Sequence, residues 1–379
     1  IVHSIRCEKL GYADDLSVVI ESETITELRH CSKIITEEIN EEMSPKKLSL
    51  EPDKTEACFL WGGGKKWRRA SFRVLDCLIR PSPSIKYLGI WLDRKLSFKS
   101  HVFKACEKAL KVHASLIPLL PNIRGPSFKK RKLILNAVYS SLFYGIPVWA
   151  EVTKISKYCA LITKTCRPIK RSLCSAYRTV SNNVLDILSG IPPTDLYIES
   201  RCRQFNGEPK PQIRDDIFER WVLRIEEDSE SDLWFKSLIP DLRSFLHRPF
   251  GETNYFMSQF FSGHGCFCDY LCRFKIINSN LCPLPGCNLT DSPEHTFFKC
   301  SFFRSERELL EAQLDSKFTI LSAQDLLFAS KDSWNYIASF VEKVLRRKSQ
   351  LMSPNPCDTP AADGILSCNS GATWTRRVT

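Results

Sequence analysis

The feature that most constrains the fold is a short polar turn near the start of the chain. Gly11, Tyr12, Ala13, Asp14 and Asp15 stand between two apolar runs within residues 1–20. This pattern predicts a buried strand, a tight turn and a second buried strand. The turn would hold two carboxylates at the edge of a sheet, where hard oxygen ligands suit Mg²⁺. Because Asp also favours ordinary turns, a purely structural role for the pair stays open.

The next segment predicts one helix and then several small strands. Thr24 stands three residues before Glu27, as in a capping box, and apolar residues recur every three or four positions to about Pro45. Short apolar pieces then alternate with turn residues, which predicts antiparallel strands at 48–50, 57–60, 72–75 and 85–92, with a glycine bend at 62–64.

From Phe98 the apolar spacing is helical, and helices dominate to about residue 200. Gly207 to Pro211 breaks the pattern, and helical spacing returns at 305–314 and 332–345. After Ser353 the composition becomes too polar to bury a core, which predicts a disordered tail.

The charge of the chain favours a polyanionic partner. Lys and Arg exceed Asp and Glu by 54 to 43, for a net charge of +11, and the excess is clustered at 65–69, 129–132 and 346–348. Clustered cations interleaved with aromatic residues suit nucleic acid, because each neutralised phosphate releases a counterion. Each cluster alone is more simply a solvated lysine-rich face.

Seventeen cysteines in a long chain without a secretory leader predict a reduced, intracellular protein. The uncharged stretch Leu133 to Ala150 approaches the length of a membrane span, but Asn136 and Pro147 lie within it, so we expect a buried helix and a turn. The chain starts at Ile1 without an initiator Met, which predicts a fragment of a longer protein.

A metal-ligand pattern lies in the last third of the chain. Cys282, Cys287, His295 and Cys300 have four, seven and four residues between them. Three thiolates and one imidazole complete a tetrahedral structural zinc site, which leaves no open position for a substrate. Four unrelated core residues are the alternative, because free cysteines are often buried.

Several motifs resemble those of one family in order and spacing. Tyr12-Ala13-Asp14-Asp15 resembles the palm hairpin of reverse transcriptases, residues 50–56 resemble the palm segment after it, and residues 85–93 resemble the primer-grip turn. Further blocks resemble the thumb, post-thumb and C-terminal domain of the jockey-like and ribosomal-DNA-inserting non-LTR (LINE-like) retrotransposons; they lie at 120–126, 144–150, 175–181 and 263–267. The resemblance covers roughly residues 8 to 345.

The resemblance implies an α+β fold and a polymerase function. It implies a partial palm at 1–95, a helical thumb and post-thumb at 96–200, a C-terminal domain with a zinc-knuckle-like site at 201–350 and a disordered tail at 351–379. The implied activity is RNA-directed DNA synthesis, which copies element RNA at a nicked target. RNA template, DNA primer or target and dNTPs would be the partners, in the nucleus and without a membrane.

The resemblance also assigns roles to residues by position. Asp14 and Asp15 would bind catalytic Mg²⁺, and Lys54 would protonate the leaving pyrophosphate. Lys54 could equally close a turn. Tyr87, Leu88 and Gly89 would hold the primer end, although Leu88 alone is more simply a core residue. A missing Cβ at Gly89 would let another backbone approach. The cations expected to track the template–primer duplex are Lys99, Lys104, Lys108, Lys111, Lys129, Lys130, Arg131 and Lys132.

The zinc pattern departs from the family at its first ligand. The family usually places its first two cysteines closer together, so Cys282 is the least certain ligand, and the residues that could replace it are Cys266, Cys268, Cys272 and His264.

Two alternatives to an active polymerase remain. The intact family protein would also carry fingers, a first palm aspartate and an upstream endonuclease, so this chain alone is expected to show no measurable primer extension. A non-enzymatic nucleic-acid-binding remnant with a structural zinc site is the first alternative. A zinc-dependent enzyme is the weaker one, because four protein ligands leave no open position.

Overall fold

The computed structural model describes residues 6–60, 70–228 and 232–352, which fall into two compact units. The predicted glycine bend at 62–64, the cationic cluster at 65–69 and the tail from 353 lie outside the described residues. The first unit holds the chain to Lys108 together with 143–159, and the second holds 109–142 and the chain from Ala160.

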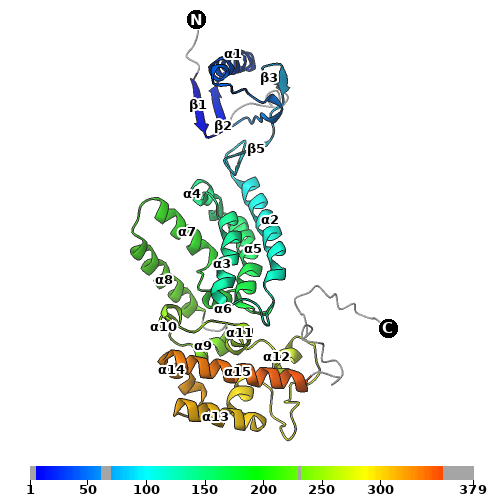
Figure 1. Cartoon of the computed structure of the whole chain (residues 1–379), viewed down its shortest axis with the longest axis vertical. Coiled ribbons are helices and arrows are strands. Elements are labelled where there is room, and N and C mark those ends of the chain that lie inside the picture. The colour runs from blue at the N-terminus through cyan, green and yellow to red at the C-terminus, as the bar shows by residue number, and fades with distance from the viewer. Residues whose placement is uncertain (1–5, 61–69, 229–231, 353–379) are drawn as a thin grey trace, which may run out of the picture. The chain divides into compact units, whose positions relative to one another are not determined.

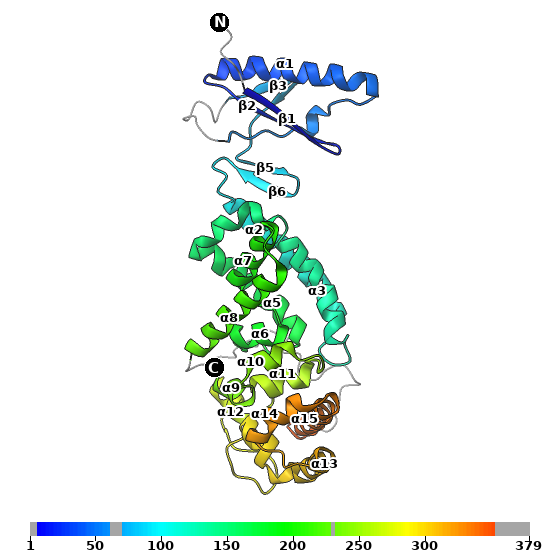
Figure 2. The ribbon, with the colours of Figure 1, turned by 90° about the vertical axis from the view of Figure 1, so that its left-hand side faces the viewer.

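In the first unit, a helix covers one face of a hairpin (Figure 1). Strands β1 (Arg6–Tyr12) and β2 (Asp15–Glu21) pair antiparallel, and α1 (Ile25–Met43) packs Cys31, Ile35 and Ile39 against them. The side chain of Thr24 accepts the backbone N–H of Glu27, as the capping pattern predicts. Figure 2 shows α1 running across the hairpin.

The other strands of this unit form two small hairpins. Strand β3 (Phe72–Val74) pairs with β4 (Cys77–Ile79), and β5 (Ser84–Tyr87) pairs with β6 (Ile90–Asp93). The strands expected at 48–50 and 57–60 do not form, because neither segment has a partner strand to pair with among the described residues. The small antiparallel sheets and the helices make a mixed structure, which is compatible with the expected α+β fold.

Helices make up the rest of the chain. Their bounds are α2 (Lys99–Leu116), α3 (Phe128–Leu142), α4 (Ile146–Trp149), α5 (Ser156–Cys174), α6 (Asn182–Ser189), α7 (Thr194–Phe205), α8 (Lys210–Glu227), α9 (Leu233–Leu238), α10 (Leu242–His247), α11 (Tyr255–Ser262), α12 (Cys268–Arg273), α13 (Arg304–Leu314), α14 (Ile320–Ala329) and α15 (Lys331–Leu351). Short 3₁₀ turns lie at 44–46, 52–54, 117–119, 150–154 and 301–303, and one π-helical turn spans His295–Lys299.

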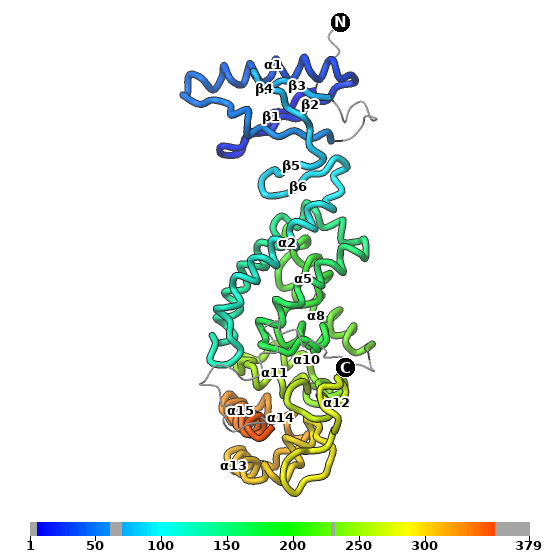
Figure 3. The backbone as a smooth tube through the Cα atoms, turned by 90° about the vertical axis from the view of Figure 1, so that its right-hand side faces the viewer, coloured from blue at the N-terminus to red at the C-terminus, as the bar shows by residue number. Residues whose placement is uncertain are grey.

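One hydrophobic core runs through the second unit, from Cys174 to Leu345. Its largest members are aromatic, and Phe260, Phe261, Phe267, Phe297 and Phe303 are fully buried. Figure 3 shows α13 and α14 beside α15, which supplies one wall of this core. The boundary expected at residue 200 falls inside α7, and the common core joins the residues on both sides of it.

Among the described residues, no single helix is long and apolar enough to cross a membrane; one bent pair, Phe128–Leu142 with Ile146–Lys154, meets the length and composition test together.

Candidate metal and nucleic-acid sites

The aspartate pair lies at the tip of the β1–β2 hairpin. Tyr12 pairs with Asp15, so Ala13 and Asp14 form a two-residue turn, in which Ala13 has a φ of +53°. Both carboxylates are exposed. The predicted hairpin is therefore confirmed, but its strands are not buried on both faces. Because α1 covers only one face, Leu10, Tyr12 and Val19 on the other are 52%, 66% and 44% exposed.

Asp14 and Asp15 alone do not complete a metal site. Among the described residues, no third metal-ligating side chain is grouped with them, and a Mg²⁺ ion takes more oxygen ligands than two carboxylates supply. Lys54 is exposed at the end of a 3₁₀ turn, where its backbone N–H donates to Glu51 O at 3.2 Å. No ion pair joins it to either aspartate in the described part of the chain.

The segment compared with the primer grip forms the turn between β5 and β6. Tyr87 pairs with Ile90, and the two residues between them have positive φ, +44° at Leu88 and +84° at Gly89. Tyr87 and Leu88 are half-buried. A Cβ on Gly89 would lie 2.9 Å from Cε1 of Tyr144. The missing Cβ thus admits a tyrosine ring, where we expected another backbone.

Three of the predicted cations share one stripe on α2. Helical geometry places Lys104, Lys108 and Lys111 at i, i+4 and i+7, opposite the buried face that includes Val102 and Ala109. Lys99 lies on the far side of the helix from Lys108. The ammonium of Lys104 lies 2.9 Å from the centre of the Trp91 ring, which holds it against β6.

The cluster at 129–132 does not form one surface, because consecutive helical residues point in different directions. Lys129, Lys130 and Lys132 are exposed, and Lys129 lies 3.9 Å from Glu252. Arg131 points inward and is 4% exposed. We therefore correct its assignment as a nucleic-acid ligand.

The guanidinium of Arg131 holds the preceding loop together. It donates to the carbonyl oxygens of Pro126 (3.0 Å), Leu120 (3.2 Å), Ser172 (3.0 Å) and Pro121. A Cβ on Gly125 would clash with Pro121 O in this loop. Burial lowers the pKa of Arg131, and four of its five N–H donors bond to carbonyl oxygens within the protein.

Cys282, Cys287, His295 and Cys300 form one buried cluster that could bind a metal ion. Their ligand atoms all lie within 4.8 Å of one another, and Nε2 of His295 is 3.3 Å from Sγ of Cys287. Tetrahedral zinc with Zn–S of about 2.3 Å separates its ligands by roughly 3.5–3.8 Å, so small shifts would complete the geometry. Cys282, the least certain ligand, belongs to the cluster, and none of its four proposed replacements does.

Local turns bring the four ligands together. Cys282 follows a β-bridge between Leu281 and Thr290, and Gly286, with a φ of +76°, turns the chain into Cys287. The π-helical turn begins at His295, and the N–H of Cys300 donates to His295 O at 2.7 Å.

Burial alone disfavours the charged forms of the cysteine and histidine side chains in this cluster. It raises the pKa values of the Cys282 and Cys300 thiols and lowers that of His295, so without a cation the neutral forms are favoured. Nδ1 of His295 is buried without a hydrogen-bond partner in the structure. A divalent cation would reverse the balance for the thiols by stabilising thiolates.

A buried ion pair beside the cluster was missed in the sequence. Lys348 Nζ lies 2.5 Å from Asp291 Oδ1, and both side chains are fully buried. Thr296 Oγ1 contacts both, and the N–H of Cys268 donates to Asp291 at 2.8 Å. The signal was the spacing of Val341, Val344, Leu345 and Lys348, which places Lys348 on the buried face of α15.

The cationic cluster at 346–348 is therefore engaged within the protein. Arg346 pairs with Glu342 at 2.8 Å, Arg347 with Glu306, and Lys348 with Asp291. It does not form the free polyanion-binding patch that its sequence suggested.

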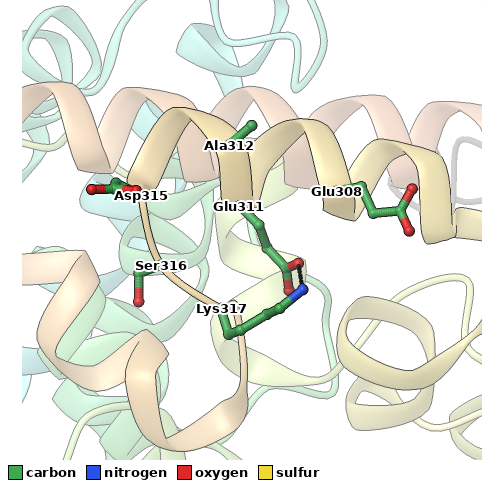
Figure 4. A pocket seen from close by; sticks show the side chains of 6 residues that line it. All are labelled: Glu308, Glu311, Ala312, Asp315, Ser316 and Lys317. Atoms are coloured by element: carbon green, nitrogen blue, oxygen red, sulfur yellow. Dashed lines mark hydrogen bonds and ion pairs between the residues drawn. The ribbon is translucent and has the colours of Figure 1, made fainter.

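Figure 4 shows an open hollow at the end of α13, lined by Glu308, Glu311, Ala312, Asp315, Ser316 and Lys317. The Glu311 carboxylate accepts Lys317 Nζ at 2.8 Å and the N–H of Phe318 at 3.0 Å. These bonds close the turn toward α14, so the hollow reflects a structural turn.

Curated proteins of one kind are similar to this chain. A retrovirus-related Pol polyprotein from type-1 retrotransposable element R1 of Nasonia vitripennis is 20% identical over 378 residues, which cover 90% of this chain and 95% of that protein. A 115 kDa protein of the R1DM element of Drosophila melanogaster is 23% identical, over 73% of this chain and 29% of that protein. A Pol polyprotein of an R1 element of Bradysia coprophila is 20% identical, over 90% and 36%.

No family model and no solved structure matches the chain. The relatives, all from type-1 retrotransposable elements, show that the chain is similar to retrotransposon-encoded proteins. More narrowly, the chain is related to the Pol polyproteins of R1-type non-LTR elements, as its motifs indicated. It spans nearly all of one relative but about a third of the length of two others.

Proposed function

We propose that the chain acts in an RNA-directed DNA polymerase of a non-LTR retrotransposon, which copies element RNA into DNA at a nicked chromosomal target in the nucleus. The observation that carries this proposal is the two-residue turn between Tyr12 and Asp15, which leaves two carboxylates exposed at the end of a hairpin. The naming of its relatives as Pol polyproteins supports it.

Within this function, each group of residues would have its own role. Asp14 and Asp15 would hold Mg²⁺, which stabilises the attacking and leaving oxygens in phosphoryl transfer. Lys54, exposed and charged, would donate a proton to the pyrophosphate. The turn at Leu88 and Gly89 would position the primer end. The α2 stripe of Lys104, Lys108 and Lys111 would follow the phosphates of the template–primer duplex.

Binding of an RNA–DNA template–primer duplex tests the α2 stripe. We expect the triple variant Lys104→Gln, Lys108→Gln, Lys111→Gln to weaken binding and to reduce the salt slope of log K by about 0.9 for each phosphate that is no longer neutralised, the B-DNA value. The matched control removes the same charge from exposed positions elsewhere, as Lys33→Gln, Lys210→Gln, Lys331→Gln. Equal weakening in both triples would mean that only net charge matters, and the stripe would have no specific role.

Primer extension tests the aspartates. We expect this chain with Mg²⁺ and dNTPs to extend no primer, because its described residues group no third ligand with Asp14 and Asp15. Extension that Asp14→Asn abolishes would contradict this expectation.

A second function is favoured by the same incomplete site. A non-enzymatic nucleic-acid-binding protein needs the cationic stripe and the Cys₃His cluster but not the aspartates. Asp14→Asn with Asp15→Asn distinguishes the two functions in a retrotransposition assay of the element, because only a polymerase role makes these carboxylates necessary.

A further inference from the structure

Three arginines, Arg167, Arg171 and Arg178, lie in or beside the segment 175–181, and all three belong to the second unit. Arg167 and Arg171 lie one turn apart on α5. Arg167 donates to the carbonyl oxygens of Arg178 at 2.9 Å and Val180 at 2.5 Å, which fixes the segment against the helix. Within the described ranges, none of the three arginines forms an ion pair with a carboxylate.

The arginines repel one another. Burial is the largest cause that lowers the pKa of Arg171, and the charges of Arg178 and Arg167 lower it further. The charge of Arg171 also lowers the pKa of His113, after burial. Like charges held close together destabilise the protein, and a bound anion would offset part of that cost.

Thr179, in the same segment, contacts the aromatic side chains that lie beside the exposed ring of Phe274. Thr179 Oγ1 lies 3.0 Å from His264 Nδ1 and 2.6 Å from the Tyr270 hydroxyl. The Tyr270 ring packs against Phe274, with centroids 5.0 Å apart. Phe274 is 44% exposed, and the guanidinium of Arg273 lies 5.8 Å from its centroid.

An exposed ring beside cations offers two kinds of contact. The face or edge of Phe274 can stack on a base, and guanidinium groups can bind the phosphates on either side of it. A duplex keeps its bases stacked inside, so an exposed aromatic ring selects an unpaired strand. One exposed aromatic residue alone would need no explanation; its connection through Thr179 to the unpaired arginines is what marks this surface.

We propose that the surface formed by Arg178, Arg273 and Phe274 binds single-stranded nucleic acid, with phosphates at the arginines and a base stacked on Phe274. The proposal rests on the proposed nucleic-acid function but uses residues separate from the α2 stripe. It assigns a role to the Ser175–Ser181 block, which the polymerase roles above leave without one.

Two labelled probes test it on the full chain by fluorescence anisotropy: a single strand of mixed sequence and a blunt RNA–DNA hybrid of equal length. We expect Phe274→Ala to weaken single-strand binding by about fivefold or more, and Phe274→Tyr to restore it. Arg178→Gln should reduce the single-strand salt slope by about 0.7. The matched controls are Phe205→Ala, at a phenylalanine that is 74% exposed, and Arg214→Gln, at an arginine whose side chain is 71% exposed.

The outcomes separate the two proposals. Loss of single-strand affinity in greater proportion than hybrid affinity, absent in the controls, supports the single-strand surface. Unchanged single-strand binding in Phe274→Ala and Arg178→Gln, or equal loss on both probes, overturns it. That result would leave the separate proposal, that the α2 stripe binds the RNA–DNA hybrid, unaffected. A wild-type chain that binds neither probe overturns both proposals.

Discussion

Two neighbouring residues in the β5–β6 turn have positive φ, and only one of them is glycine. A two-residue hairpin loop with positive φ at both central positions matches the twist of its strands, and Asn or Gly usually occupies the first position. Leu88 occupies it here, at +44°. A backbone conformation that is unfavourable for the residue often lies at a functional site. Ten other non-glycine residues in the described part of the chain also have positive φ, so the proposed role of this turn at the primer end needs a functional test.

Leu88→Asn separates backbone strain from function. Relief of roughly 1 kcal/mol of left-handed strain should offset the loss of a half-buried side chain, so the free energy of unfolding should stay within about 1 kcal/mol of wild type. If the turn holds the primer end as proposed, affinity for a template–primer duplex should fall, because the Leu88 side chain is no longer there to contact the primer. Urea unfolding and anisotropy measure the two effects.

Leu96→Asn is the matched control for this variant. Leu96 also has a positive φ, +49°, is 46% exposed and lies outside the turn. Its free energy of unfolding should also stay within about 1 kcal/mol of wild type, and its affinity for the duplex should not change. If Leu88→Asn bound the duplex as tightly as Leu96→Asn, the turn would have no part in holding the primer.

At the scale of elements, local patterns predicted what local contacts decide. The alternation on either side of Tyr12 and Asp15 gave the hairpin, and Thr24 with its apolar stripe gave α1, because turns and caps depend on neighbours in sequence. The segments 48–50 and 57–60 are apolar enough for strands but have no partner strand among the described residues. Pairing depends on distant residues, which periodicity does not reveal.

The candidate sites also differ in whether their residues lie close together or far apart in the sequence. The Cys₃His cluster was predictable because its ligands lie within 19 residues, Cys282 to Cys300, and short turns bring them together. The proposed magnesium site would need further ligands from segments far apart in the sequence, so the pattern at Asp14 and Asp15 could suggest such a site but could not complete it. Arg131 and Lys348 were assigned to solvent as members of cationic runs. The fold buries both, because each lies on the inward face of its helix.

The Lys348–Asp291 pair joins α15 to the loop between two members of the Cys₃His cluster, Cys287 and His295. Lys348→Met leaves the Asp291 carboxylate buried without its counter-charge, which should destabilise the protein by about 3–5 kcal/mol in urea unfolding. Adding Asp291→Asn should recover part of that loss, because no uncompensated charge remains buried.

The control for this pair lies on the same helix. Lys343 is exposed, so Lys343→Met should change stability by no more than about 0.5 kcal/mol. A loss in Lys348→Met no larger than in Lys343→Met would show that the buried pair contributes nothing to holding the loop.

At the scale of the whole molecule, the two units differ in what stabilises them. In the first, α1 covers one face of a two-stranded sheet with a small core of Cys31, Ile35 and Ile39. In the second, a continuous aromatic core extends to α15, and the Cys₃His cluster lies within it. A metal bound at the cluster would therefore stabilise the second unit directly.

Removal of zinc should affect the two units unequally. The purified chain is expected to carry a single zinc ion, measured by elemental analysis, and Cys300→Ser should lose it. Hydrogen exchange should then accelerate in 282–300 and in α13 and α15, which pack beside that segment, because the neutral, metal-free ligands no longer hold the turns together. Exchange in α1 should not change.

The control for this prediction is Cys174→Ser. It puts the same polar replacement at a fully buried position outside the cluster, so it should lower stability yet retain the metal. Zinc retained in Cys300→Ser, or an equal rise of exchange in α1, would show that the cluster does not hold a structural ion in this unit.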